Sequence, residues 1–131
     1  MISVIDIKDI VYSVVKASEL ASTVNGVVSK TIRPTGSCKE DIVISVLDNS
    51  GKQMQQFILN VNIYVSDIEK GKDSIENTVR IRQLCLLSNN LFESIIMENW
   101  RCELQKQSVI KVEGKEEHCI NNRILINYLN S

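Results

Sequence analysis

The stretch Phe57-Ile58-Leu59-Asn60-Val61-Asn62-Ile63-Tyr64-Val65 (FILNVNIYV) has the clearest periodicity in the chain. Its odd-numbered positions are all apolar, whereas its even-numbered positions carry two amides, a tyrosine and one isoleucine. A strict period of two places alternate side chains on opposite faces of a β-strand. The pattern predicts a long strand from Gln53 to Val65, with one face on the core and Asn60, Asn62 and Tyr64 on the other.

A second strand is predicted just before it, from Asp41 to Leu47. Ile42, Ile44 and Val46 share one face of this segment, and the following residues Asp48-Asn49-Ser50-Gly51 are typical of a turn. Residues 41–65 are therefore expected to form an antiparallel hairpin.

The N-terminal segment from about Ile5 to Leu20 has the spacing of an amphipathic helix. Its apolar face would consist of Ile7, Ile10, Val11, Val14, Val15 and Ser18. Ser3 with Asp6 three residues later predicts a capped helix start. Asn25-Gly26 marks a turn, and Val27 to Ile32 is expected to form a short strand whose pairing stops at Pro34.

The second half of the chain predicts a connector, a long helix and a second hairpin. Ser66 to Lys72 is polar and contains Gly71, and Asp73 with Glu76 offers a capping box for a helix that runs to about Glu98. Strands are expected over Trp100–Val112 and His118–Leu129, joined by Glu113-Gly114-Lys115-Glu116. One face of the last strand would carry Ile120, Ile124, Ile126 and Tyr128. This final strand is a candidate edge strand that could pair with another chain.

The order of these elements predicts an α+β fold in one domain, residues 1–131. Strands grouped in hairpins, with helices between them, favour a mostly antiparallel sheet of about five strands (α-β-β-β-α-β-β) packed against two helices. Hydrophobic residues make up 44% and charged residues 24% of the 131 residues, which is typical of a globular domain.

Charge and hydropathy argue against several classes of partner. The net charge is −1 and the basic residues are dispersed, so long-range attraction to nucleic acid or anionic lipid is not expected. Charges interrupt every apolar run well before the length of a membrane span. The N-terminal residues MISVIDIKDI contain acids where a signal peptide has a basic flank, so we interpret the protein as mature and intracellular when made.

Candidate catalytic groups are few. His118 is the single histidine, next to a predicted hairpin turn, and Glu40-Asp41 is an adjacent acidic pair. Adjacent residues of a strand point to opposite faces, which argues against a shared substrate, and a salt bridge from Arg33 would explain the pair equally well. We predict no catalytic residue, metal site or cofactor.

The four cysteines do not form a zinc-binding pattern. They stand at positions 38, 85, 102 and 119, without a C-x-x-C pair. Cys102 and Cys119 could face each other across the last hairpin. We interpret the cysteines as small buried side chains in a reducing compartment.

The loop between the first two predicted strands raises two hypotheses. It contains the one proline of the chain, Pro34, together with Arg33, Lys39, Glu40 and Asp41. Such a loop could be catalytic, or it could dock onto a neighbouring subunit.

Two local runs and the order of elements resemble a known family. Arg33 to Ile44 (RPTGSCKEDIVI) and Asn60 to Asp67 (NVNIYVSD) resemble segments of small proteins encoded in the structural modules of phages of Bacteroides-like hosts. The element order over nearly the whole chain resembles the tail-terminator and tail-completion (head–tail joining) proteins of tailed bacteriophages. The second run departs from the family at Ser66, where a proline commonly stands.

The resemblance implies a structural virion protein without catalytic residues. Such proteins form six-fold or twelve-fold rings in the neck or tail of the virion, assemble in the cytoplasm of the bacterial host, and let DNA pass without sequence-specific binding. Their partners would be further copies of the chain and the neighbouring portal, adaptor, stopper and tail-tube proteins, with no membrane. The expected contact residues are Arg33, Pro34, Ser37, Lys39, Glu40, Asp41, Asn60, Asn62 and Tyr64. Replacing Arg33 with Glu should then block assembly and leave the monomer folded.

Two other classes of function stay open. One is a small metal-dependent hydrolase or nuclease that uses Glu40, Asp41 and His118. The other is a monomeric adaptor or ligand-binding domain with a pocket under the long helix.

Overall fold

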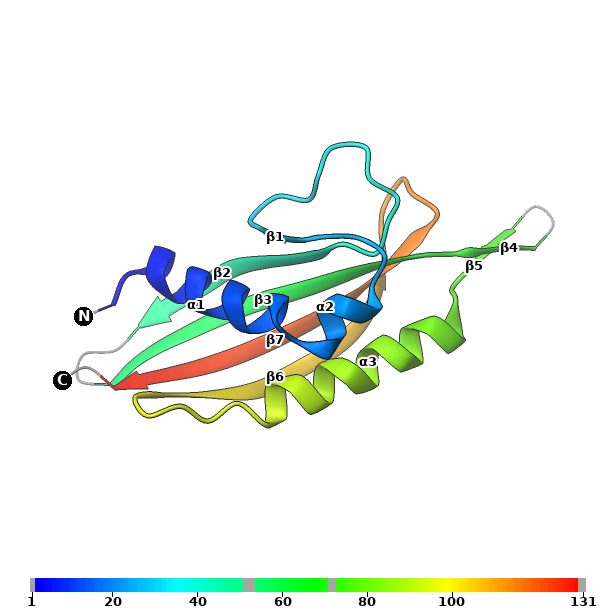
Figure 1. The fold of residues 1–131 in the computed structure, drawn as a ribbon. Helices are drawn as coiled ribbons and strands as arrows, with labels where there is room; N and C mark the ends of the chain where they lie inside the picture. The colour runs from blue at the N-terminus through cyan, green and yellow to red at the C-terminus, as the bar shows by residue number, and fades with distance from the viewer. Residues whose placement is uncertain (1, 51–53, 71–72, 130–131) are drawn as a thin grey trace.

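The computed structural model describes residues 2–50, 54–70 and 73–129, and it has the predicted α+β architecture (Figure 1). Its helices are α1 (Val4–Lys16), α2 (Glu19–Thr23) and α3 (Thr78–Glu93). Its strands are β1 (Val28–Lys30), β2 (Ile42–Ser50), β3 (Met54–Ser66), β4 (Ile68–Lys70), β5 (Asp73–Ile75), β6 (Trp100–Lys111) and β7 (Glu117–Leu129). Five strands form a mostly antiparallel sheet in the order β1-β2-β3-β7-β6, and β4 pairs with β5 separately. The predicted five-stranded sheet is confirmed, with three helices where the sequence predicted two.

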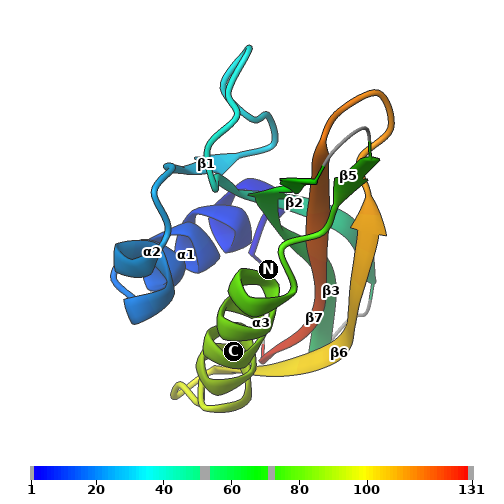
Figure 2. The same ribbon diagram turned by 90° about the vertical axis from the view of Figure 1, so that its right-hand side faces the viewer.

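The helices cover one face of the sheet and leave the other open (Figure 2). The core lies between these two layers, and β3 forms its centre. Phe57, Leu59, Val61 and Ile63 have no exposed surface and Val65 has 1%, so the alternation that predicted this strand is confirmed. The other layer contributes Ile7, Val11, Val15, Leu20, Ile81, Leu84 and Phe92.

The N-terminal segment is not one helix. The predicted start is correct, because the Asp6 amide donates to Ser3 Oγ and the Ser3 amide donates back to Asp6 Oδ2. The break comes at Ser18, whose hydroxyl donates to the Val15 carbonyl and accepts from the Ala21 amide. Ser18 is therefore an N-cap that begins α2, and not part of the apolar stripe of a longer helix.

The strand at the β1 edge is shorter than predicted. Thr31 has φ of 69°, a left-handed conformation that is uncommon for a β-branched residue, and the Ile32 amide donates to the Lys30 carbonyl across it. This tight turn, and not Pro34, ends β1. The strand runs parallel to β2.

The turn predicted at Asp48-Asn49-Ser50-Gly51 is wrong for its first three residues. They continue β2 and pair with β3, because the hairpin ladder extends further than the local turn signal indicates. A bulge between Val46 and Asp48 accommodates the extra residue. Gly51 and Gln53 lie outside the described residues.

The polar connector and the start of the long helix also differ from the prediction. The connector contains β4, which pairs with β5, and Asp73 belongs to β5, so it cannot cap a helix with Glu76. Gly71 and Lys72 lie outside the described residues. Asn77 is the N-cap of α3, since its Oδ1 accepts from the Arg80 amide. The helix ends at Glu93 and not at Glu98.

The last strand is not an edge. β7 lies between β3 and β6 and pairs with both over most of its length, so the described edges of the sheet are β1 and β6. The sequence was misleading because β7 is rich in asparagine. Asn122 is fully buried and bonds to Gln107 and Ser88, which links β7 and β6 to α3. Confirmed core residues of this strand are Ile120, Ile124 and Ile126.

Candidate interaction site: the 31–41 loop and the open sheet face

Arg33 holds the predicted docking loop onto the sheet. Its Nη1 and Nη2 atoms lie 2.7 and 2.8 Å from the two carboxylate oxygens of Glu117, and its Nε lies 2.9 Å from Asp41 Oδ2. The guanidinium also stacks over the ring of Tyr64, 4.1 Å from the centroid. Because Arg33 and both acids are largely buried, these contacts fix the loop as one charge-paired unit.

Glu40 joins the same loop to the helical layer. Its two carboxylate oxygens each accept a 2.7 Å hydrogen bond from Arg80 of α3. Glu40 and Asp41 therefore point to opposite sides, as predicted for adjacent residues of an extended segment. Neither partner could be found from the sequence, because Arg80 lies 40 positions from Glu40 and Glu117 lies 84 positions from Arg33.

The electrostatics of this unit favour the charged forms. The pKa of Arg33 is raised, first because it donates to Glu117 and then because it donates to Asp41, against an opposing effect of burial. Burial alone would raise the pKa of Asp41, but hydrogen bonds from Ser37, Arg33 and the Val27 amide outweigh it and lower that pKa. Only glycine fits at position 26, because a Cβ on that residue would lie 2.5 Å from Asp41 Oδ1.

The predicted contact residues of the loop fall into two groups. Arg33, Ser37, Glu40 and Asp41 use their side chains for contacts within the chain. Pro34 and Lys39 are exposed, as are Ile32 and the left-handed Gly36. The loop stands away from the sheet beside β1 (Figure 1), so its outer residues are the ones that a partner can reach.

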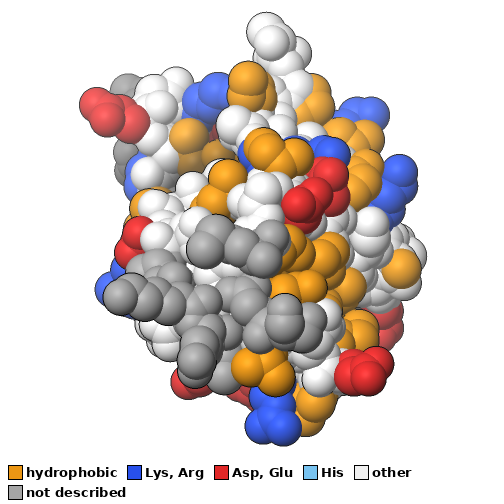
Figure 3. Space-filling view, turned by 90° about the vertical axis from the view of Figure 1, so that its left-hand side faces the viewer, with side chains coloured by type: hydrophobic (Ala, Val, Ile, Leu, Met, Phe, Trp, Pro, Cys, Tyr) orange, Lys and Arg blue, Asp and Glu red, His pale blue; other side chains and the backbone are white. Residues whose placement is uncertain are grey.

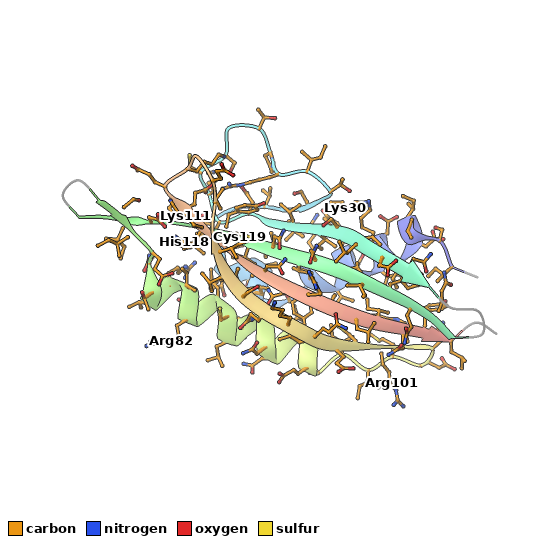
Figure 4. All side chains as sticks on the ribbon, turned by 180° about the vertical axis from the view of Figure 1, so that it is seen from behind. Lys30, Arg82, Arg101, Lys111, His118 and Cys119 are labelled. Atoms are coloured by element: carbon orange, nitrogen blue, oxygen red, sulfur yellow. The ribbon has the colours of Figure 1, made fainter. Side chains whose placement is uncertain are left out.

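Asn60, Asn62 and Tyr64 lie on the face of the sheet that carries no helix, as their alternation predicted. Their neighbours in β7 are Arg123, Asn121 and Cys119, respectively. Asn121 Nδ2 donates to Asn60 Oδ1 at 3.2 Å and to Asn62 Oδ1 at 2.6 Å. Figure 4 turns this helix-free face toward the viewer, with the sheet in front of the helices.

His118 is engaged elsewhere. Its Nδ1 lies 2.6 Å from Asp67 Oδ1, and Asp67 also accepts hydrogen bonds from Ser74 and Lys111. Burial would raise the pKa of Asp67, but the hydrogen bonds from His118, Ser74 and Lys111 lower it overall. The three groups named for an enzyme are thus not gathered: Glu40 pairs with Arg80, Asp41 with Arg33, and His118 with Asp67.

The cysteines do not form the expected pair. Cys102 pairs across the ladder with Ile126 of the core, whereas Cys119 pairs with Ile110 and Tyr64 on the open side. Burial raises the pKa of Cys102 to about 12 and of Cys119 to about 11. Cys119 is buried, Cys85 and Cys102 are half-buried and Cys38 is exposed, so the interpretation of all four as buried is correct for Cys119 alone among them.

Hollows on the described surface are shallow or small. One open hollow of about 570 Å³ is lined by Cys38, Ser66, Asp67, Lys115, Glu116 and Glu117. A pocket of about 270 Å³ lies between α2 and α3, smaller than most ligand sites. Within residues 2–50, 54–70 and 73–129, no three His, Cys, Asp or Glu side chains are grouped as a metal site.

No protein-family model and no curated protein sequence matches this chain. Among the helices of the described residues, none has both the length and the hydropathy needed to cross a membrane.

Proposed function

We propose that the chain is a structural subunit of the neck or tail of a tailed bacteriophage, where identical copies close into a ring around the DNA path. The resemblance of the segments 33–44 and 60–67 supports this assignment. The ring joins portal-side and tail-tube proteins and performs no catalysis.

The distribution of exposed apolar residues carries the proposal. At one end of the sheet, the β4–β5 hairpin extends away from the domain (Figure 1) and exposes its cross-strand pair Ile68 and Ile75 by 40% and 45%. At the other end, near both termini, Val4, Leu47 and Leu129 are exposed by 36%, 52% and 53%. Figure 3 looks onto that end, where hydrophobic side chains lie among charged ones.

Two different apolar surfaces at opposite ends favour head-to-tail association. A contact between unlike surfaces is heterologous, and it generates a closed ring when the repeated rotation brings the last copy back to the first. Large exposed apolar side chains that are grouped in this way commonly mark protein contacts. The exposed residues of the 31–41 loop, Ile32, Pro34 and Lys39, are then available to the next component of the neck.

The test removes the hairpin contact. The double variant Ile68→Ser/Ile75→Ser should lose the ring, as measured by light-scattering mass and negative-stain imaging. It should keep the melting temperature of the monomer, because both side chains are already well exposed. The matched control is Leu86→Ser, an apolar side chain of α3 that is 58% exposed and belongs to neither end. Rings that form equally well from the double variant would contradict the proposal.

A further inference from the structure

The centre of the open sheet face carries a group of side chains that we call the donor patch. It occupies two neighbouring cross-strand rows of β2, β3, β7 and β6. The first row consists of Ser45, Asn60, Arg123 and Lys106. The second contributes Asn62, Asn121 and Ser108. All seven are at least partly exposed.

Hydrogen bonds within the donor patch occupy the side-chain oxygens of Asn60 and Asn62, and among the described residues they leave the Asn121 side-chain oxygen as a further acceptor. The amide group of Asn121 donates to the side-chain oxygens of both Asn60 and Asn62. The NH₂ groups of Asn60 and Asn62 have no acceptor among the described residues. An incoming ligand therefore meets N–H donors at these two positions.

Arg123 adds an uncompensated charge. Its Nε is buried and has no hydrogen-bond partner within the described part of the chain. Directly opposite it stands Lys106, and like charges in facing positions destabilise a sheet. Neither cation forms an ion pair with a described carboxylate, whereas the other partly buried arginines, Arg33 and Arg80, are both paired with acids.

We propose that the donor patch binds the sugar–phosphate backbone of nucleic acid without reading its sequence. This inference rests on the proposed function and identifies the open face as the one that lines the DNA path. A phosphate oxygen would accept a hydrogen bond from Arg123 Nε. Its negative charge would also offset the repulsion between Arg123 and Lys106.

The composition of the donor patch favours a phosphodiester over an acidic protein segment. Arg, Lys, Ser and Asn are the side chains that contact phosphate and sugar oxygens in protein–DNA complexes. Aromatic stacking on bases is not offered, because Arg33 already covers the ring of Tyr64. Two cations per subunit make each contact weak and salt-sensitive, which suits DNA that must slide through a ring.

The experiment is an NMR titration of the protein with short DNA duplexes of two unrelated sequences at low salt. We expect shifts of the side-chain amide signals of Asn60 and Asn62 and of the Arg123 Nε–H signal, equal for both sequences and reversed by salt. Replacing Lys106 and Arg123 together with Gln should reduce the slope of log affinity against log salt by about 2. The single variant Lys106→Gln, at an exposed position, should reduce it by about 1.

A matched pair of variants controls for net charge. Lys16→Gln with Arg82→Gln removes one lysine and one arginine from exposed positions on α1 and α3, the helices of the covered face, and should leave the salt slope unchanged. The inference fails if DNA does not shift the donor-patch signals, or if both pairs of variants weaken binding equally. It also fails if poly-glutamate shifts these signals at lower concentration than DNA does.

The mass of the same samples separates this inference from the proposed function. If rings form but DNA does not shift the donor-patch signals, the inference is wrong and the proposed function still stands. If the protein forms no ring even when portal and tail-tube proteins are present, yet binds DNA through Arg123, the proposed ring function is wrong and the inference is supported.

Discussion

At the scale of single residues, three arginines of this domain differ in what surrounds them. Arg33 contacts Asp41 and Glu117, Arg80 contacts Glu40, and Arg123 faces Lys106. Removing one partner of a buried ion pair leaves an uncompensated charge, which costs more than the pair itself contributes. Truncation to alanine should therefore cost much more stability at Arg33 than at Arg123.

The variant Arg33→Ala should lower the free energy of unfolding by about 3 kcal/mol at neutral pH, because it leaves two buried carboxylates without their cation. Urea denaturation measures this loss. Arg123→Ala, which relieves a like-charge pair, should change stability by less than about 1 kcal/mol. Equal losses in the two variants would show that the Arg33 contacts do not stabilise the fold.

The Arg33 contacts also alter the expectation for Arg33→Glu. That variant would place a third carboxylate against Asp41 and Glu117, so the monomer itself should be destabilised. Lys39→Glu, at an exposed position of the same loop, is the better probe of docking. It should weaken joining to the next ring and leave the melting temperature unchanged.

The two aspartates with lowered pKa values predict how stability depends on pH. In the folded protein the pKa values of Asp41 and Asp67 both lie below the ordinary value of 3.8. Their contribution to stability is therefore complete well above that value and is lost as the pH falls through the folded-state pKa. Urea denaturation below about pH 5 should show a shallower decline for Asp67→Asn than for the wild type. If the stability of both proteins fell equally with pH, Asp67 would not contribute to the acid sensitivity of the fold.

At the scale of elements, the buried amide of Asn122 fixes how α3 lies on the sheet. It accepts from Gln107 Nε2 at 2.7 Å and donates to Ser88 Oγ at 3.2 Å. Buried polar networks stabilise one arrangement only when every member has a partner. Asn122 therefore links two strands to one helix inside an otherwise apolar layer.

Asn122→Ala should cost about 2 kcal/mol of unfolding free energy, because Gln107 loses the nearer of its two acceptors and Ser88 loses its donor. Asn127→Ala is the matched control on the same strand, where the amide lies on the open face and accepts from Gln56. Thermal unfolding of the two variants should differ clearly. A control as unstable as Asn122→Ala would argue against the network.

Elements with long periodic patterns were predictable, and elements set by distant partners were not. The alternation from Phe57 to Val65 predicted β3 and both of its faces correctly. The pair Asp73 and Glu76 matched a helix-capping signal, but Asp73 pairs with Lys70 in a hairpin that no local pattern indicated. In the same way, Asn60, Asn62 and Tyr64 could be placed on one face, whereas their neighbour Arg123 emerged only from the strand order β3-β7-β6.

At the scale of the whole molecule, the fold separates three surfaces. The helices occupy one face of the sheet, the donor patch lies on the other, and each end carries its own exposed apolar side chains, Ile68 and Ile75 at one and Val4, Leu47 and Leu129 at the other. In a ring, the ends would meet the neighbouring copies and one face would turn inward. We propose that the open face is the inner one.

The most direct test of the ring proposal is the light-scattering mass of the purified protein over a concentration series, alone and with portal and tail-tube proteins. A ring-forming subunit should give a closed species of six or twelve copies of the 14.8 kDa chain, visible as rings in negative stain. A mass that stays at 14.8 kDa at every concentration and with every partner would contradict the ring proposal.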